Sequence, residues 1–212
     1  MGLTTQLDLY LVRHGLTEWN KQKRYLGHTD IDISATHINE ISMLKDALHP
    51  LSFDVCYTSD LRRCVQTVQH LLPYQSYHVD QRLRELNFGL WEGLTYEQLK
   101  ENQHYQSWLS DWEAYSPPQG ETGHQFLSRV QSFLSDCLTD HIPQAPNDLS
   151  RVLVVTHGGV IRAILSAMVK EKSFWEWQVQ HGSAIRLRLG LEEGEWQCYS
   201  WSAVPTQASA RL

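Results

Sequence analysis

Two stretches of the chain share one pattern, in which an aliphatic run ends at a histidine followed by glycine. The first is Leu7–Gly15 (LDLYLVRHG) and the second is Arg151–Gly159 (RVLVVTHGG). Such apolar runs are typical of strands buried in a parallel sheet. The carboxyl ends of parallel strands meet at one edge of a sheet, where open α/β proteins bind their ligands. If the two strands are neighbours, His14 and His157 face each other across one pocket.

Between these two stretches the pattern alternates between strand and helix. Ser34 is expected to begin a helix over about 35–48, and an alternating strand follows over 53–58. Ser59 is expected to cap the next helix, which Pro73 stops. A βαβα order favours parallel strands joined by right-handed crossovers. The expected fold class is therefore α/β, a three-layer α/β/α arrangement with a mostly parallel central sheet.

The middle of the chain departs from this order. Over about 87–125, tryptophans and tyrosines crowd a polar segment, which predicts a helical, aromatic-rich insertion over the active site rather than another βα unit. An amphipathic helix follows over about 122–138, and 141–150 is expected to be a loop. The alternating pattern of 184–189 predicts a strand, joined through a hairpin turn to a second one over 196–201.

Composition limits the classes of protein that fit. A chain of 212 residues with 42% hydrophobic content is long enough for one substantial core, so we expect one domain over 1–212 with a mobile tail over about 203–212. A net charge of −6 argues against general binding to nucleic acid or to a membrane surface. Four scattered cysteines without a C-x-x-C pair, and no leader sequence, indicate reduced thiols and a cytoplasmic protein. We expect a monomer or a homodimer.

The residues at the strand ends are suited to phosphoryl transfer, which needs a nucleophile, cations around the phosphate oxygens and a proton for the leaving group. A neutral imidazole such as His14 can carry a phosphoryl group, and Arg13 offers fixed donors to its oxygens. A second arginine is expected just after Ser59. Helical spacing does not choose between Arg62 and Arg63, because both lie off the apolar stripe.

A carboxylate is the expected source of the proton, and spacing alone does not separate Glu85 from Glu92. We expect no cofactor, since the chain has neither a Walker A loop nor a G-x-G-x-x-G motif. We also expect no metal, since it has no H-E-x-x-H motif and no ligand-spaced Cys/His cluster. The remaining histidines are expected at the surface or on the substrate side; they include His28, His104, His124 and His181.

Four motifs, in order along the chain, resemble those of the histidine phosphatase (phosphoglycerate mutase-like) superfamily. They are R-H-G-x-T-x-x-N at 13–20, S-x-L-x-R-x-x-x-T at 59–67, L-R-E-x-x-F-G-x-W-E-G at 83–93 and T-H-G at 156–158. The resemblance implies a phosphohistidine formed on His14 and chooses Arg63 as the second arginine. It also implies that Glu85 is the proton donor and His157 a donor to the phosphate, with Glu92 structural. It adds further candidates for substrate binding, namely Thr17, Asn20, Gly27 and Arg62.

Within this superfamily the sequence favours a metal-independent phosphatase acting on small phosphate monoesters. The insertion has one cation, Lys100, whereas the mutases hold a second acidic group with basic residues, and Leu26 stands where mutases have a polar contact. The aromatic residues would suit a flat leaving group, as in α-ribazole 5′-phosphate, or a broad-specificity enzyme, although they could equally serve only to pack the insertion. The alternatives are a phosphoglycerate mutase and a catalytically silent phosphate-binding protein on the same fold.

Overall fold

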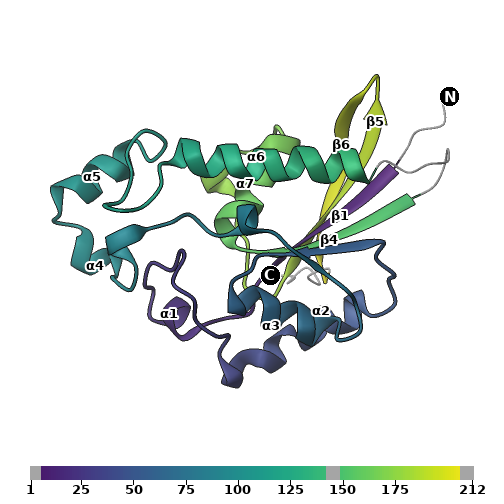
Figure 1. Ribbon diagram of the computed structural model, residues 1–212, viewed down its shortest axis with the longest axis horizontal. Helices are drawn as coiled ribbons and strands as arrows, with labels where there is room; N and C mark the ends of the chain where they lie inside the picture. The colour runs from purple at the N-terminus through teal and green to yellow at the C-terminus, as the bar shows by residue number, and fades with distance from the viewer. Residues whose placement is uncertain (1–5, 142–148, 206–212) are drawn as a thin grey trace, which may run out of the picture.

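The computed structural model describes residues 6–141 and 149–205, and a six-stranded sheet lies at its centre (Figure 1). The strand order is β3-β2-β4-β1-β5-β6. The strands are β1 (Gln6–Arg13), β2 (Val55–Thr58), β3 (His78–Val79), β4 (Leu149–Thr156), β5 (Ala184–Glu192) and β6 (Glu195–Val204). The first four strands run parallel, whereas β5 and β6 are antiparallel to their neighbours. The prediction of a mostly parallel sheet is confirmed.

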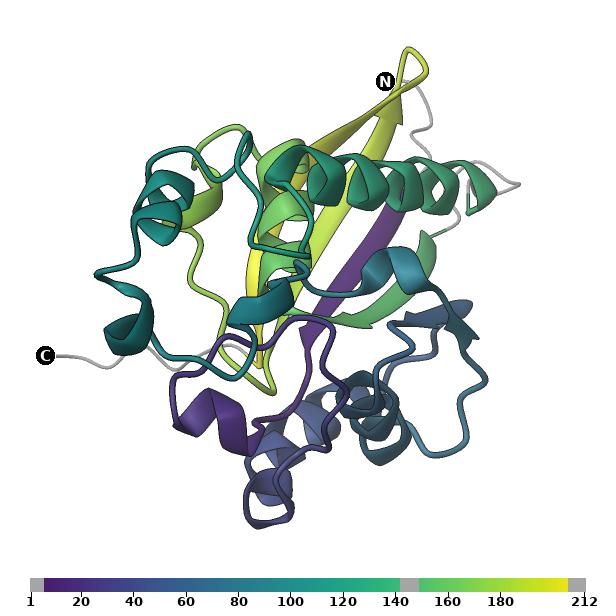
Figure 2. The same cartoon turned by 60° about the vertical axis from the view of Figure 1, so that its left-hand side comes forward.

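Helices cover both faces of the sheet (Figure 2). The α-helices of the described residues are α1 (Glu18–Lys21), α2 (Ser42–Leu48), α3 (Arg62–Leu71), α4 (Tyr96–Leu99), α5 (Gln103–Ser110), α6 (Gly123–Asp140) and α7 (Gly158–Met168), of which α2, α3, α6 and α7 pack on the sheet. Side chains of successive residues in β1 point alternately into the two apolar layers on either side of the sheet. Leu9 and Leu11 pack with α6 and α7, whereas Tyr10 and Val12 pack with α2 and α3. The three-layer prediction is therefore confirmed.

Two helix starts differ from the prediction. The helix expected over 35–48 is a 3₁₀ helix over Ala35–Ile41 followed by α2, since a run containing several β-branched residues is a weak former of regular α-helix. Ser59 is not the cap of α3, because the helix begins at Arg62 and Leu61, with extended backbone angles, occupies the cap position. The Ser59 hydroxyl lies instead 3.1 Å from His157 Nε2.

The end of the chain forms the predicted hairpin. Glu193 and Gly194 join β5 to β6 with φ angles of 51° and 86°, a pair of left-handed residues suited to a two-residue turn between twisted strands. β6 runs to Val204, so the first residues of the predicted tail belong to a strand, and the rest of the tail, 206–212, lies outside the described residues. Likewise, β4 begins within the loop expected over 141–150, of which 142–148 lie outside the described residues.

The insertion lies beyond the carboxyl ends of β1 and β4, where α4 and α5 extend away from the sheet (Figure 1). A buried aromatic group holds it together: the Trp91 ring centroid lies 5.2 Å from that of Tyr105 and 5.5 Å from that of Trp108. These three side chains pack the insertion, as one of the two interpretations of its aromatic residues requires. None of the described helices is both long and apolar enough to cross a lipid bilayer.

Candidate active site

The two His-Gly segments meet at one edge of the sheet. β1 and β4 are parallel neighbours whose register pairs Arg13 with Thr156, so His14 and His157 follow at the same level. The backbone N–H of His14 donates to the Thr156 carbonyl at 2.9 Å. The two imidazole centroids lie 5.1 Å apart at an interplanar angle of 62°. The juxtaposition expected from the repeated pattern is therefore present.

His14 is held as a neutral base. Its Nδ1 lies 2.8 Å from the Gly15 carbonyl oxygen, which can only accept a hydrogen bond, so Nδ1 carries the proton and Nε2 keeps its lone pair. Burial, followed by the positive charge of Arg63, holds the pKa of His14 well below its usual range. An unprotonated imidazole nitrogen is the form that can attack phosphorus.

Arg13 lies against the start of α7. A Cβ on Gly158 would come 3.1 Å from Arg13 Cζ, a contact tight enough to push the guanidinium aside by a few tenths of an ångström. Arg13 Nη1 donates to the Val179 carbonyl, while its buried Nε has no hydrogen-bond partner among the described residues. Burial lowers the pKa of Arg13 to about 10, and the nearby Glu85 carboxylate opposes that shift.

The structure separates the two neighbouring arginines. Arg63 is fully buried, and its guanidinium donates to the carbonyls of Thr29 (2.9 Å) and Gly27 (2.6 Å) and to His157 Nδ1 (3.3 Å). Arg62 points away and pairs with Asp32 at 2.8 Å, with more than half of its side chain exposed. Arg63 therefore belongs to the pocket, as the family pattern implies, and Arg62 lies outside it.

His157 is fully buried beside Arg63. Because Arg63 Nε can only donate, His157 Nδ1 accepts and the ring proton sits on Nε2, which faces Ser59. Burial and the charge of Arg63 hold the pKa of His157 well below its usual range. The Cys64 thiol lies 3.4 Å from Nε2, and burial raises its pKa to about 12, so it stays protonated and unreactive.

Glu85 reaches the pocket from the segment between the sheet and the insertion. Its two carboxylate oxygens accept hydrogen bonds from the backbone N–H groups of Leu86 (2.9 Å) and Gly159 (3.0 Å). Gly159 belongs to the first turn of α7, where the helix dipole favours a negative charge. The anion-attracting helix end at this pocket therefore belongs to α7. The N-terminus of α3, by contrast, is occupied by Asp30, which accepts from the Arg62 N–H.

Arg129 on α6 fixes the backbone that carries Glu85. Its guanidinium donates to the carbonyls of Arg84 (2.6 Å) and Glu85 (2.8 Å), and it is held in turn by the carboxylate of Glu121. The other glutamate of this motif, Glu92, has a structural role in the loop rather than a place beside His14. It accepts from the backbone N–H groups of His28 (2.7 Å) and Thr29 (2.6 Å) and so ties down the loop that receives Arg63.

The other substrate-binding candidates have local structural contacts. Thr17 and Asn20 form the capping box of α1, with Asn20 Oδ1 accepting from the Thr17 N–H at 3.1 Å. Gly27 passes so close to the next segment that a Cβ would lie 2.3 Å from the Leu86 carbonyl oxygen. Its own carbonyl accepts from Arg63. Gly27 thus shapes the pocket through its backbone.

Two residues of the site escaped the sequence analysis. His181, placed only among the surface or substrate-side histidines, has its ring centroid 5.3 Å from that of His14. The available signal was the antiparallel pairing of β5 with β1, which matches Val12 with Ala184 and brings the residues before β5 to the pocket edge. Arg162, one turn along α7 from Gly159, lines the neighbouring aromatic pocket and has its Cζ 5.9 Å from the Trp175 ring centroid.

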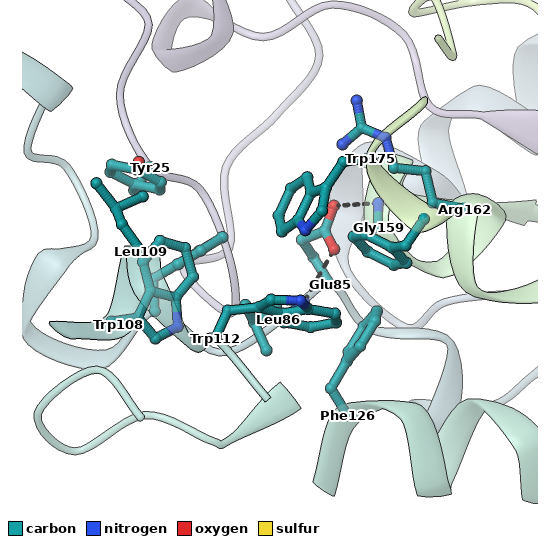
Figure 3. Close-up of a pocket in the computed structure, with 12 residues that line it drawn as sticks. Tyr25, Glu85, Leu86, Trp108, Leu109, Trp112, Phe126, Gly159, Arg162 and Trp175 are labelled. Atoms are coloured by element: carbon teal, nitrogen blue, oxygen red, sulfur yellow. Dashed lines mark hydrogen bonds between the residues drawn. The ribbon is translucent and has the colours of Figure 1, made fainter. Parts of the chain in front are cut away.

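An aromatic pocket of about 240 Å³ opens beside the Glu85 carboxylate (Figure 3). Residues from the insertion and from the 3₁₀ turn Phe174–Glu176 meet there, where Trp112 stacks on Phe174 at 4.7 Å between centroids. The pocket is lined by Tyr25, Glu85, Leu86, Phe88, Trp108, Leu109, Trp112, Phe126, Gly159, Arg162, Phe174 and Trp175. No group of three or more His, Cys, Asp or Glu side chains in the described ranges could hold a metal ion.

Comparison with known proteins identifies the family. The family model described as the histidine phosphatase superfamily (branch 1) matches residues 9–204. The chain belongs to the histidine phosphatase superfamily. The match includes all four motifs, the whole of β4 and most of β1. The phosphatase interpretation and the expected fold class are confirmed at this level.

Among relatives in this superfamily, an adenosylcobalamin/alpha-ribazole phosphatase of Salmonella typhimurium (strain LT2) is 30% identical over 193 residues, covering 87% of this chain and 93% of the relative. A probable phosphoglycerate mutase of Enterobacter sp. (strain 638) is 27% identical over 201 residues, 92% of this chain and 90% of the relative. The crystal structure of the alpha-ribazole phosphatase from Shigella flexneri superposes with a TM-score of 0.77 at 26% identity, covering 90% of this chain and 94% of the other.

Proposed function

We propose that this histidine phosphatase hydrolyses small phosphate monoesters through a phosphohistidine on His14. One observation carries the proposal: a neutral imidazole with a free Nε2 lies beside the guanidinium groups of Arg13 and Arg63, with the Glu85 carboxylate near Arg13. Each component that phosphoryl transfer requires is present in that pocket, which also argues against the alternative of a catalytically silent phosphate-binding protein.

The first chemical step follows from these positions. His14 Nε2 attacks phosphorus while the bond from phosphorus to the ester oxygen breaks, and Glu85, in its protonated form, gives its proton to the departing alkoxide. Arg13 and Arg63 donate to the equatorial oxygens of the phosphoryl group, and the Nε2–H of His157 turns from Ser59 to the same group. In the second step Glu85, now a carboxylate, takes a proton from water as the water attacks the phosphohistidine, which releases inorganic phosphate and restores His14.

The aromatic pocket supports a substrate whose leaving group is flat and apolar. The proton of Glu85 must reach the ester oxygen, so the leaving group extends from His14 past Glu85 and into the space lined by Trp112 and Phe174. We propose α-ribazole 5′-phosphate, a ribosylated aromatic ring system, as the candidate substrate, in keeping with the names of several relatives. A broad-specificity phosphatase with the same preference is the second candidate.

The mutase alternative is less well supported by the pocket. The only lysine or arginine between 85 and 125 is Lys100, and that ammonium is paired with Glu97 at 2.7 Å. Arg162 is the one described cation that lines the aromatic pocket. We therefore propose water as the acceptor. We also propose that the enzyme works in the cytoplasm as a monomer or homodimer, without metal, nucleic acid or membrane.

A rapid-quench experiment tests the mechanism. Wild-type enzyme mixed with labelled substrate should yield an acid-labile, base-stable phosphoprotein that is absent from His14→Ala. A label that survives acid, as phosphoserine does, would overturn the proposal. Incubation with 3-phosphoglycerate and a bisphosphate primer tests the mutase alternative. Efficient formation of 2-phosphoglycerate would show that the enzyme catalyses isomerisation rather than hydrolysis.

The substrate class is tested by leaving groups matched in basicity. Primary alkyl phosphates that end in a naphthyl ring should have a higher kcat/KM than those ending in a polar chain, and Trp112→Ala should reduce that preference by several-fold to about tenfold. Trp196→Ala is a matched control, because Trp196 lies on β6 and is not among the residues that line this pocket. An unchanged preference in Trp112→Ala would leave packing as the only role of this aromatic residue.

A further inference from the structure

His181 lies at the phosphate end of the site, although none of the four motifs contains it. Its ring contacts that of His14 at 5.3 Å between centroids, with an interplanar angle of 66°. The next residue fixes its backbone, because the Gly182 N–H donates to the carbonyls of Arg13 (3.1 Å) and His14 (3.2 Å). His181 is therefore held in place by the same strand end that presents the nucleophile.

Two buried nitrogens beside His14 have no hydrogen-bond partner among the described residues. They are His181 Nε2 and Arg13 Nε. A buried polar atom without a partner is unfavourable, and in native proteins such an atom calls for an explanation, of which a catalytic role or a bound ion is one. A guanidinium N–H can only donate, so the group that would satisfy it is an acceptor. Both nitrogens belong to residues that contact or adjoin the proposed nucleophile, which points to the oxygens of the phosphoryl group.

The charge state of His181 suits a hydrogen-bond donor. Burial, together with the positive charge of Arg13, lowers the pKa of His181 to about 3, so the ring is neutral and carries one N–H. An anion next to Nε2 favours the tautomer with the proton on that nitrogen. A neutral ring also donates without adding a cation beside His14, whose nucleophilic form carries no charge.

We propose that His181 is a catalytic residue whose Nε2–H donates a hydrogen bond to the phosphoryl group as that group moves between the substrate oxygen and His14. The proposal rests on the phosphohistidine mechanism proposed above and adds a third imidazole to it. Because a donor aimed at developing charge acts mainly in the transition state, its removal should affect the chemical step more than the binding of substrate.

Two substitutions separate donation from packing. His181→Phe keeps a ring against His14 and removes the donor, whereas His181→Asn keeps a donor and removes most of the ring. His124 offers a matched control, since that histidine on α6 is largely exposed and lies outside the pocket. His124→Phe and His124→Asn should leave turnover unchanged. Urea unfolding of each variant confirms that the fold is retained.

Three measurements test the proposal: the burst rate constant with an alkyl phosphate, and the affinities for vanadate and for inorganic phosphate. His181→Phe should slow the burst by roughly 10²-fold, the usual effect of losing one such donor. It should also weaken the binding of vanadate, which resembles the transition state, more than the binding of inorganic phosphate. His181→Asn should recover most of both losses. A burst in His181→Phe as fast as in the wild type, or Asn and Phe variants equally impaired, would overturn the proposal.

The two proposals fail in different ways. If the wild type forms no phosphoenzyme, the mechanism proposed for the enzyme is wrong, and the vanadate and phosphate affinities still report whether His181 donates to an anion in this pocket. If the wild type forms the phosphoenzyme and His181→Phe retains both the burst and the vanadate affinity, only the role of His181 is wrong.

Discussion

The Glu85 carboxylate lies directly against the backbone of Gly159, in the space that a side chain at position 159 would occupy. Glu85 Oε2 accepts the Gly159 N–H at 3.0 Å, and a Cβ on Gly159 would come 2.2 Å from Oε1. The atom met is the end of a flexible side chain, so a methyl group there would displace the carboxylate and leave the backbone in place. The position of the proposed acid is thus set by a glycine in the first turn of α7.

Gly159→Ala should therefore impair catalysis without impairing folding. Alanine forms helix better than glycine by up to about 1 kcal/mol, so the free energy of unfolding should stay level or rise. The burst rate with an alkyl phosphate should fall by roughly 10²-fold, because Glu85 no longer reaches the leaving oxygen. Urea unfolding and burst kinetics measure the two quantities. A stable variant with an unchanged burst would show that this contact does not position the acid.

Glu85→Gln should discriminate between leaving groups. An alkoxide needs a proton as it departs, a contribution worth ~10²–10⁴-fold, whereas nitrophenolate leaves readily without one. The burst with an alkyl phosphate should therefore slow far more than the burst with p-nitrophenyl phosphate. Glu92→Gln is the matched control. Because Glu92 only ties down the loop that receives Arg63, it should slow both substrates to the same extent. Equal losses for both substrates in Glu85→Gln would contradict proton donation.

The two adjacent arginines should differ sharply in effect. Arg63→Ala removes a buried cation from the pocket and leaves the carbonyls of Gly27 and Thr29 without their donor, so kcat/KM should fall by roughly 10²–10³-fold. Arg62→Ala removes a solvent-exposed pair with Asp32 and should change kcat/KM by less than about threefold, as is usual for surface ion pairs. Steady-state kinetics with one small monoester decide the matter. A large loss in Arg62→Ala would place that residue on the substrate.

Activity should not require a divalent metal. The described residues offer no cluster of three metal-ligating side chains, and the proposed chemistry uses only imidazole, guanidinium and carboxylate groups. Exhaustive chelation with EDTA should leave kcat/KM unchanged, and vanadate should inhibit, since it can adopt the trigonal bipyramid of the transition state. Loss of activity on chelation and recovery on adding one divalent ion would contradict this prediction.

Protein stability should fall as the pH drops below about 6.5. The pKa values of His14, His157 and His181 are lowered in the folded protein, so between the folded and unfolded pKa values the unfolded chain binds more protons. Their contribution is fully present above pH 6.5 and is lost progressively below it, at up to ~1.4 kcal/mol per pH unit for each histidine. Urea unfolding from pH 7 to pH 5 measures the slope. His181→Phe should reduce it by up to about one proton, and an identical slope would mean that His181 binds protons equally in the folded and unfolded states.

The amino-acid sequence determined the framework of this protein. The aliphatic runs of Leu7–Val12 and Arg151–Val155 predict two buried strands, and the helical periodicities between them favour parallel strands joined by crossovers. The structure shows that the two strands are neighbours. Those local patterns place His14 and His157 at the same edge of the sheet. Spacing alone did not single out Glu85 or Arg63, and it was the resemblance to the family that made them the candidates.

Only the tertiary structure decided the rest, because the remaining contacts join segments far apart in the chain. Ser59 looked like a helix cap. Its hydroxyl instead faces His157, because Ser59 follows β2 and His157 follows the neighbouring strand β4. His181 carries no local signal, and its place beside His14 follows from the antiparallel pairing of β5 with β1. Periodicity reports which face of an element is buried. It does not report which long-range partner lies opposite, and in this site such partners set the charge of His14 and the position of Glu85.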